Sequence, residues 1–157
     1  MASELDTIFA QVHNDGEIQQ ILTQISAAIP NGETISAGTK ERMTEILKDI
    51  YYSHPNIESI YLLPYYDHTL FSAVPKITSG ISGDDLKMIK QNGTNTTWLK
   101  CSDDVITYGR LMVSLQDVKP LGYLIINLSE NELFDIYRNI SIYKDGSIFI
   151  TDRSGSI

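Results

Sequence analysis

The chain has 157 residues, of which 42% are hydrophobic and 20% charged, and its formal net charge is -8. This length fits one domain with a core of its own. The acidic balance argues against nucleic acid as a partner, because binding to phosphates depends on clustered Lys and Arg. One cysteine permits neither an intrachain disulfide nor a thiolate zinc site, and the three histidines lack metal-ligand spacing, so we expect no metal and no cofactor. No apolar run is long enough to span a membrane, and the first residues lack the pattern of a signal peptide.

The N-terminal third carries helical patterns. Apolar residues recur at steps of three and four over residues 5–29, which predicts a helical segment. Asp15 and Gly16 interrupt this pattern, so we expect a bend or a new helix cap there. A second helical pattern over residues 36–52 ends before Pro55, because the residue preceding a proline avoids the helical region.

Strand patterns follow these helices. Runs rich in β-branched and aromatic residues predict strands over residues 57–64 and 69–74, joined as a hairpin, and an edge strand over residues 96–101. Between them, residues 82–91 are amphipathic and typical of a short helix, with two acidic residues in the first turn where the helix dipole favours them.

The longest β-rich stretch runs over residues 105–129. It divides into strands over residues 105–115 and 121–129 with a polar turn between them, which predicts the central hairpin of an antiparallel sheet. A helix is predicted over residues 130–139, and turn signals on both sides predict a further strand over residues 147–151. The chain stops where another strand pattern begins, as expected of a fragment of a longer protein.

Together these elements predict an α+β fold. An antiparallel sheet of about five strands, with a long N-terminal helical segment and flanking helices, is the PAS-like layout.

Several phrases of the sequence resemble the extracytoplasmic sensor region of YesM-type two-component histidine kinases. The phrases are DGEIQQIL, HPNIESIYLL, YGRLMVSL, GYLIINLSENEL and SIFITDRSGSI. In that family an Asn-Ile-x-x-Ile-Tyr-Leu segment opens the sheet, a Gly-x-Leu-x-Ile-x-Leu strand followed by a helix completes the distal module, and an Asp-x-x-Gly hairpin opens a second module. Residues 56–62, 122–128 and 152–155 match these three places. The amino-acid-binding Arg-x-x-x-Trp-Tyr signature of some double Cache domains is not present.

The resemblance implies a double Cache architecture built from PAS-like modules. It implies an N-terminal helical segment over residues 1–55, a PAS-like Cache module over residues 56–140 and the start of a truncated second module over residues 141–157. The implied function is extracytoplasmic sensing of a small-molecule or peptide signal in a bacterial, membrane-anchored histidine kinase, with no catalysis by this part. An alternative is an intracellular PAS-like scaffold that binds another protein and no small molecule.

Five residues are candidates for a ligand pocket. Tyr108 and Arg110 share one face of the first strand of the central hairpin, because alternate strand residues point the same way. Tyr61, Trp98 and Tyr123 could line the same side. Aromatic rings around one guanidinium would suit a small carboxylate or a sugar. Alternatively, the aromatic side chains fill the core and Arg110 pairs with a surface acid.

Two further patterns have alternative interpretations. The apolar stripe over residues 5–25 could pair with a second copy in a homodimer, or it could pack on its own sheet. Adjacent aspartates at residues 84–85 and 103–104 resemble catalytic pairs, but a helix cap and a turn explain them. No nucleophile or phosphate-binding motif is present, so we expect no enzymatic activity.

Overall fold

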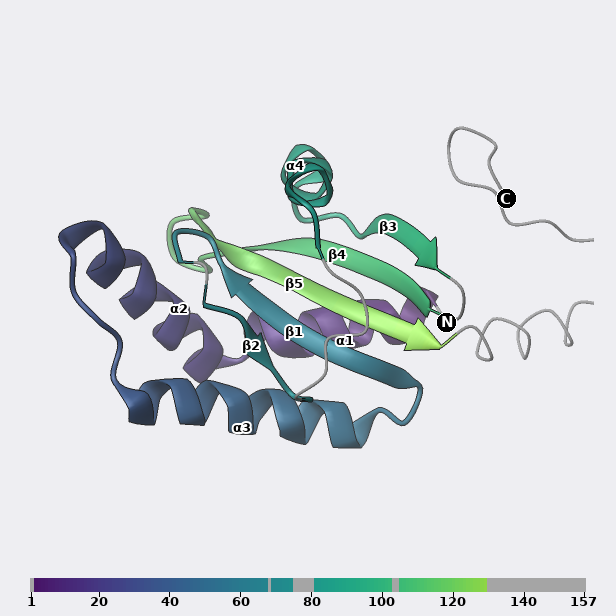
Figure 1. Ribbon diagram of the computed structural model, residues 1–157, viewed down its shortest axis with the longest axis horizontal. Coiled ribbons are helices and arrows are strands. Elements are labelled where there is room, and N and C mark those ends of the chain that lie inside the picture. Colours follow the sequence, from purple (N-terminus) through teal and green to yellow (C-terminus); the bar gives the residue numbers. More distant parts are fainter. Residues whose placement is uncertain (1, 68, 75–80, 103–104, 130–157) are drawn as a thin grey trace, which may run out of the picture.

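The protein is α+β. The structure is a computed structural model that describes residues 2–67, 69–74, 81–102 and 105–129, and this part of the chain contains four α-helices and one five-stranded antiparallel sheet (Figure 1). The helices are α1 (Ala2–Asn14), α2 (Gly16–Ala28), α3 (Ala37–Ser53) and α4 (Gly83–Asn92), with a short 3-10 helix (Ile29–Asn31) after α2. The strands are β1 (Ile57–Pro64), β2 (Phe71–Ser72), β3 (Thr97–Ser102), β4 (Val105–Val113) and β5 (Pro120–Ser129). The predicted helix over residues 130–139, the strand over residues 147–151 and the second module over residues 141–157 lie outside the described residues.

The strands are arranged in the order β2-β1-β5-β4-β3, and every neighbouring pair is antiparallel. β5 therefore lies at the centre, where Ile126 stands opposite Ile60 of β1 and Tyr108 of β4. The predicted five-stranded antiparallel sheet and its long central hairpin are confirmed.

β2 is shorter than the predicted strand over residues 69–74. The hydroxyl of Ser72 donates to the carbonyl of Val74 at 2.7 Å and accepts from the Val74 N–H at 3.2 Å. The Ala73 N–H still donates to the carbonyl of Ile60 at 3.2 Å, but the chain bends at residues 73–74, so regular pairing ends after two residues.

Side-chain caps start three of the helices. The expected cap after the first helical segment is confirmed, because Asp15 accepts a hydrogen bond from the Ile18 N–H at 2.9 Å. Ser36 caps α3 in the same way. Ser82 and Asp85 form a reciprocal capping box at α4, an arrangement that satisfies two backbone donors at once.

One face of the sheet, called here the helical face, is covered by α1, α2 and α3 (Figure 1). The core between them is aliphatic with a few aromatic rings. Its members include Leu5, Ile8, Phe9, Val12, Ile18, Leu22, Leu47, Ile60, Leu62, Leu124 and Ile126. The apolar stripe of the first two helices therefore packs on its own sheet, and a homodimer through α1 would have to use the polar side of that helix.

The opposite face, called here the α4 face, is covered by a different set of elements. α4 packs across β3 and β4, on the side of the sheet away from α1, α2 and α3 (Figure 1). Fully buried Ile89 lies against Gly109, where an added Cβ would stand 2.7 Å from Ile89 Cγ1. A side chain at position 109 would therefore push α4 off the sheet.

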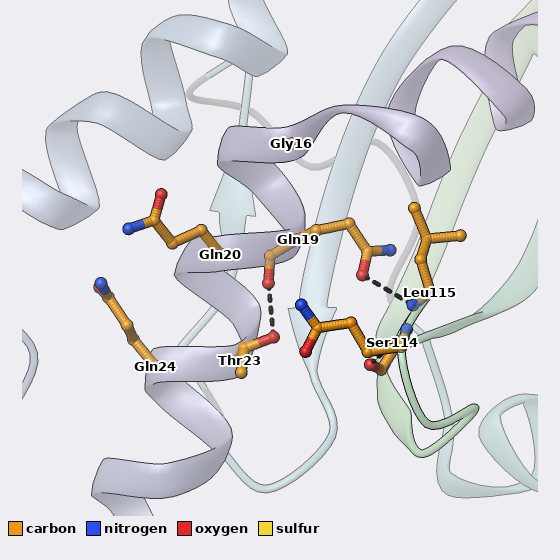
Figure 2. A pocket seen from close by; sticks show the side chains of 8 residues that line it. Gly16, Gln19, Gln20, Thr23, Gln24, Ser114 and Leu115 are labelled. Carbon is orange, nitrogen blue, oxygen red and sulfur yellow. Dashed lines mark hydrogen bonds between the residues drawn. The ribbon is translucent and has the colours of Figure 1, made fainter.

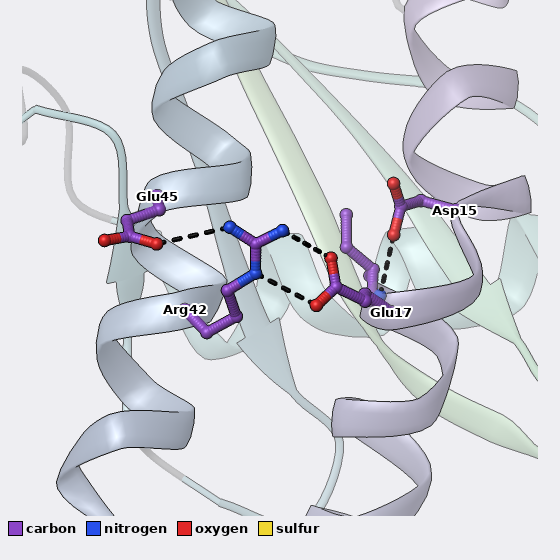
Figure 3. A network of polar contacts seen from close by, with 5 residues as sticks. Asp15, Glu17, Arg42 and Glu45 are labelled. Atoms are coloured by element: carbon purple, nitrogen blue, oxygen red, sulfur yellow. Dashed lines mark hydrogen bonds and ion pairs between the residues drawn. The ribbon is translucent and has the colours of Figure 1, made fainter.

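Arg42 of α3 forms an ion pair that connects α3 to α2 at the surface (Figure 3). Its Nε and Nη2 atoms donate to the two carboxylate oxygens of Glu17 at 2.9 and 2.6 Å, and Nη1 donates to Glu45 at 3.2 Å. Hydrogen bonding to Arg42 lowers the pKa of Glu17. About half of each side chain of the bidentate pair is exposed, so the pair orients the two helices more than it stabilises the fold.

Candidate functional site

The five residues proposed from the sequence lie on two different faces of the sheet. Tyr108 and Arg110 stand opposite Ile126 and Leu124 of β5 and belong to the helical face. Trp98 pairs with Tyr108 across β3 and β4, with ring centroids 4.2 Å apart.

Tyr61 and Tyr123 belong to the α4 face. The expectation that all five residues line one side is therefore wrong, because the strand registers put Tyr61 and Tyr123 on the opposite side from Arg110.

Arg110 is held by contacts on the helical face. Its guanidinium lies 5.4 Å from the centre of the Phe9 ring, Nη1 is 3.8 Å from Asp6 Oδ1, and Nε donates to the carbonyl of Thr94. The contact with Asp6 agrees with the alternative expectation for Arg110, pairing with a surface acid. These contacts fix Arg110 between α1 and the loop before β3, so its donors point at the protein's own groups.

The α4 face gathers a different set of polar side chains, called here the tyrosine–lysine cluster. It consists of Tyr65, Tyr66, Tyr123 and Lys90. The rings of Tyr65 and Tyr123 stack with centroids 5.6 Å apart and planes 19° apart, and Tyr66 meets Tyr65 edge-on at 5.0 Å. The Lys90 ammonium lies 5.5 Å from the centre of the Tyr65 ring, within the range of a cation–π contact.

Several elements hold this cluster in place. Tyr123 is on β5, and Tyr65 directly follows β1, where its N–H donates to the carbonyl of Leu121 at 3.0 Å. Lys90 is in the last turn of α4. The cluster therefore connects β5 and the end of β1 to the last turn of α4.

The electrostatics of the cluster favour the ammonium form of Lys90 and the neutral form of Tyr123. A hydrogen bond with Tyr65 raises the pKa of Lys90, and burial raises the pKa of Tyr123. Among the described residues, no carboxylate forms an ion pair with Lys90. A positive charge flanked by hydroxyl donors and stacked rings can bind the oxygens of a carboxylate or phosphate and an apolar group beside them.

A row of buried polar side chains crosses the same face of the sheet. Asn127 Nδ2 donates to Ser59 Oγ, and Thr107 Oγ1 donates to Asn127 Oδ1, both at 2.7 Å. All three side chains are at most 1% exposed. Buried polar groups cost free energy unless they are hydrogen-bonded, so this Ser59–Asn127–Thr107 row fixes the register of β1, β5 and β4 on the α4 face.

Neither the row nor Lys90 is among the site residues predicted from the sequence. Lys90 is one of several polar residues in the predicted amphipathic helix, and the helical pattern does not distinguish it from the others. For the row, the available signal was one polar residue at an inward position in each of three apolar strand patterns, of which Asn127 within Ile-Ile-Asn-Leu is the clearest. The tyrosine–lysine cluster and the row make the α4 face the candidate site.

The described residues contain no group of three or more His, Cys, Asp or Glu side chains placed to hold a metal ion. Within the same part of the chain, no helix combines the length and apolar character needed to cross a membrane. Comparison with models of known protein families and with curated proteins gave no match.

Proposed function

We propose that this chain is the extracytoplasmic ligand-sensing domain of a bacterial, membrane-bound sensor histidine kinase. The α+β architecture with its five-stranded antiparallel sheet is compatible with the PAS-like layout that the sequence resemblance implies. The domain itself performs no chemistry, and its output is a change in conformation.

The observation that carries the proposal is the composition of the α4 face. The tyrosine–lysine cluster lies on the face where a single short helix packs across β3 and β4, while three helices cover the opposite face. An anionic ligand would contact Lys90 on α4 and Tyr123 on β5 at the same time. The ligand class that fits best is a small molecule with a carboxylate and an apolar part.

Signalling would follow from a shift in population. A ligand that bridges α4 and β5 binds best to one position of the helix, and it favours that position by its difference in affinity. The start of α1 and the end of β5 lie at the same end of the domain (Figure 1). A change at the sheet would reach both elements there, and in the proposed parent these continue toward the membrane.

A thermal-shift screen of the 157-residue chain against amino acids and small organic acids tests the binding step. A ligand at about a hundred times its dissociation constant adds ~2.7 kcal/mol, which raises Tm by roughly 5–10 °C for a domain of this size. Lys90→Gln and Tyr123→Phe should remove the shift. Lys48→Gln and Tyr52→Phe, two exposed positions on α3, are the matched controls.

A chimera of this domain with a histidine kinase reporter tests the signalling step. Ligand-dependent output should disappear in the Lys90→Gln variant and persist in the Lys48→Gln variant. Ligand-dependent output that is unaffected by every substitution in the tyrosine–lysine cluster would refute the proposal. A flat thermal-shift screen together with capture of a cytoplasmic protein would favour the PAS-like scaffold instead.

A further inference from the structure

A groove of about 450 Å³ lies between α2 and the turn that joins β4 to β5 (Figure 2). It is lined by Gly16, Gln19, Gln20, Thr23, Gln24, Ser114, Leu115 and Gln116. The groove is distinct from the candidate site, because α2 covers the helical face and the tyrosine–lysine cluster lies on the α4 face. It is also at the far end of the domain from the start of α1 and the end of β5 (Figure 1).

One amide side chain holds the walls of the groove together. Gln19 Nε2 donates to the carbonyls of His13 and Val113 at 2.8 and 3.1 Å, and Gln19 Oε1 accepts from the Leu115 N–H at 3.2 Å (Figure 2). The amide therefore binds the end of α1, the end of β4 and the following turn. The groove is preformed, which lowers the entropic cost of binding.

Three other glutamines remain available to a ligand. Gln20, Gln24 and Gln116 are exposed, and none of their side chains hydrogen-bonds to another residue in the described ranges. Each carboxamide offers one acceptor oxygen and two donor hydrogens. The lining contains no charged side chain, although the whole chain carries a net charge of -8. The groove therefore suits an uncharged ligand that is rich in both donors and acceptors.

The spacing of two of these amides matches an extended peptide. Gln20 and Gln24 are four residues apart on one face of α2, which corresponds to about 6 Å along the helix axis. Alternate residues of an extended chain are about 6.6 Å apart and direct their peptide groups to the same side. Each glutamine amide can thus pair with one of two alternate peptide groups.

The rim of the groove adds an apolar contact. Leu115 lines the groove and is 57% exposed, and Val118 of the same turn, which is not part of the lining, is 71% exposed. Val118 has a φ of 59°, in the left-handed region that a β-branched residue rarely adopts. Exposed apolar side chains on a strained turn offer an anchor for a partner's apolar residue. The lining contains no aromatic ring on which a sugar could stack.

We propose that this groove binds an uncharged, extended segment of a partner protein, through its peptide groups and one apolar side chain seated near Leu115. The segment lies along α2, with alternate peptide groups on Gln20 and Gln24. This proposal does not depend on the sensing function, because it uses a separate surface.

The test is selection from a phage-displayed library of random peptides on the immobilised 157-residue chain. Enriched peptides are then synthesised, and their affinities are measured by fluorescence anisotropy. We expect uncharged sequences with one conserved aliphatic residue. Their affinity should fall at least about tenfold, or ~1.4 kcal/mol, in the Gln20→Ala/Gln24→Ala variant and change little with salt.

Gln91→Ala removes an exposed glutamine on α4 and is the matched control, for which affinity should not change. The double alanine variant affects only exposed helix positions, so it should fold, and circular dichroism checks this. The proposal is overturned by no enrichment, by charged peptides or by peptides that bind the double variant equally well. Neutral oligosaccharides that bind wild type and not the double variant, without any enriched peptide, would also overturn it.

Discussion

The two faces of the sheet are both buried, but by different chemistry. On the helical face, three helices pack aliphatic side chains such as Leu47, Leu62 and Leu124, all 0% exposed. On the α4 face, one short helix packs across β3 and β4, and the sheet carries tyrosines and the hydrogen-bonded Ser59–Asn127–Thr107 row. Apolar packing tolerates many volume-conserving sequences, whereas a polar row needs particular partners. We therefore expect the helical face to supply most of the stability and the α4 face to supply specificity.

The largest expected loss of stability comes from the helical face. Leu47→Ala should lower the free energy of unfolding by about 2–5 kcal/mol, because it opens a cavity under a fully buried side chain. Urea denaturation measures the change. Lys48→Ala, at the exposed neighbouring position on α3, should change it by less than about 0.5 kcal/mol. Equal effects at the two positions would contradict the packing of α3 on the sheet.

A smaller loss is expected where α4 meets the sheet. Gly109→Ala should cost about 1–3 kcal/mol through overpacking, because the added methyl group meets the buried side chain of Ile89. Combining it with Ile89→Val should recover part of the loss, and the double-mutant cycle measures this coupling. Strictly additive effects would show that Ile89 does not lie against position 109.

Replacing the central residue of the polar row should lower the stability of the protein. Asn127→Ala leaves the Ser59 and Thr107 hydroxyls without one of their buried partners, at a cost of about 1–3 kcal/mol. Replacing all three by apolar residues, with Ser59→Ala, Thr107→Val and Asn127→Leu, should recover part of that stability. A triple variant less stable than the single one, by thermal denaturation, would show that the row contributes more than its own hydrogen bonds.

The smallest predicted effect is a pH dependence on the helical face. Burial lowers the pKa of His13 below its ordinary value of 6.5, and the positive charge of Arg110 lowers it further. The unfolded chain therefore binds this proton at a higher pH than the folded protein does. The contribution of neutral His13 is complete above about pH 6.5 and is lost as the pH falls toward the lower folded pKa.

His13→Gln should accordingly flatten the stability curve in this acidic window. Urea midpoints measured from neutral to mildly acidic pH provide the check. Identical slopes for wild type and His13→Gln would exclude this group as the cause.

Most elements of the fold could be predicted from the sequence. Long helical and strand patterns placed α1 to α4 and the five strands within a few residues, and the break at Asp15 marked a real cap. These features are local, since hydrophobic periodicity and capping residues act over a few positions.

The candidate site could not be predicted in the same way. Tyr61, Tyr123 and Arg110 come from three strands, and a shift of one residue in register moves a side chain to the other face. Irregular pairing near Ser59 of β1 and Trp98 of β3 adds such shifts. The partners of the polar row are up to 68 residues apart in the chain, and no local pattern joins them.

The triple contact of Gln19 restricts which residue can occupy that position. The position requires one acceptor and two donors at the end of a side chain long enough to reach the turn before β5. Asparagine is one carbon too short, and glutamate would set a negative charge against two carbonyl oxygens. A library randomised at position 19 and selected for folding should therefore return glutamine almost alone, although the residue is polar and lies near the surface.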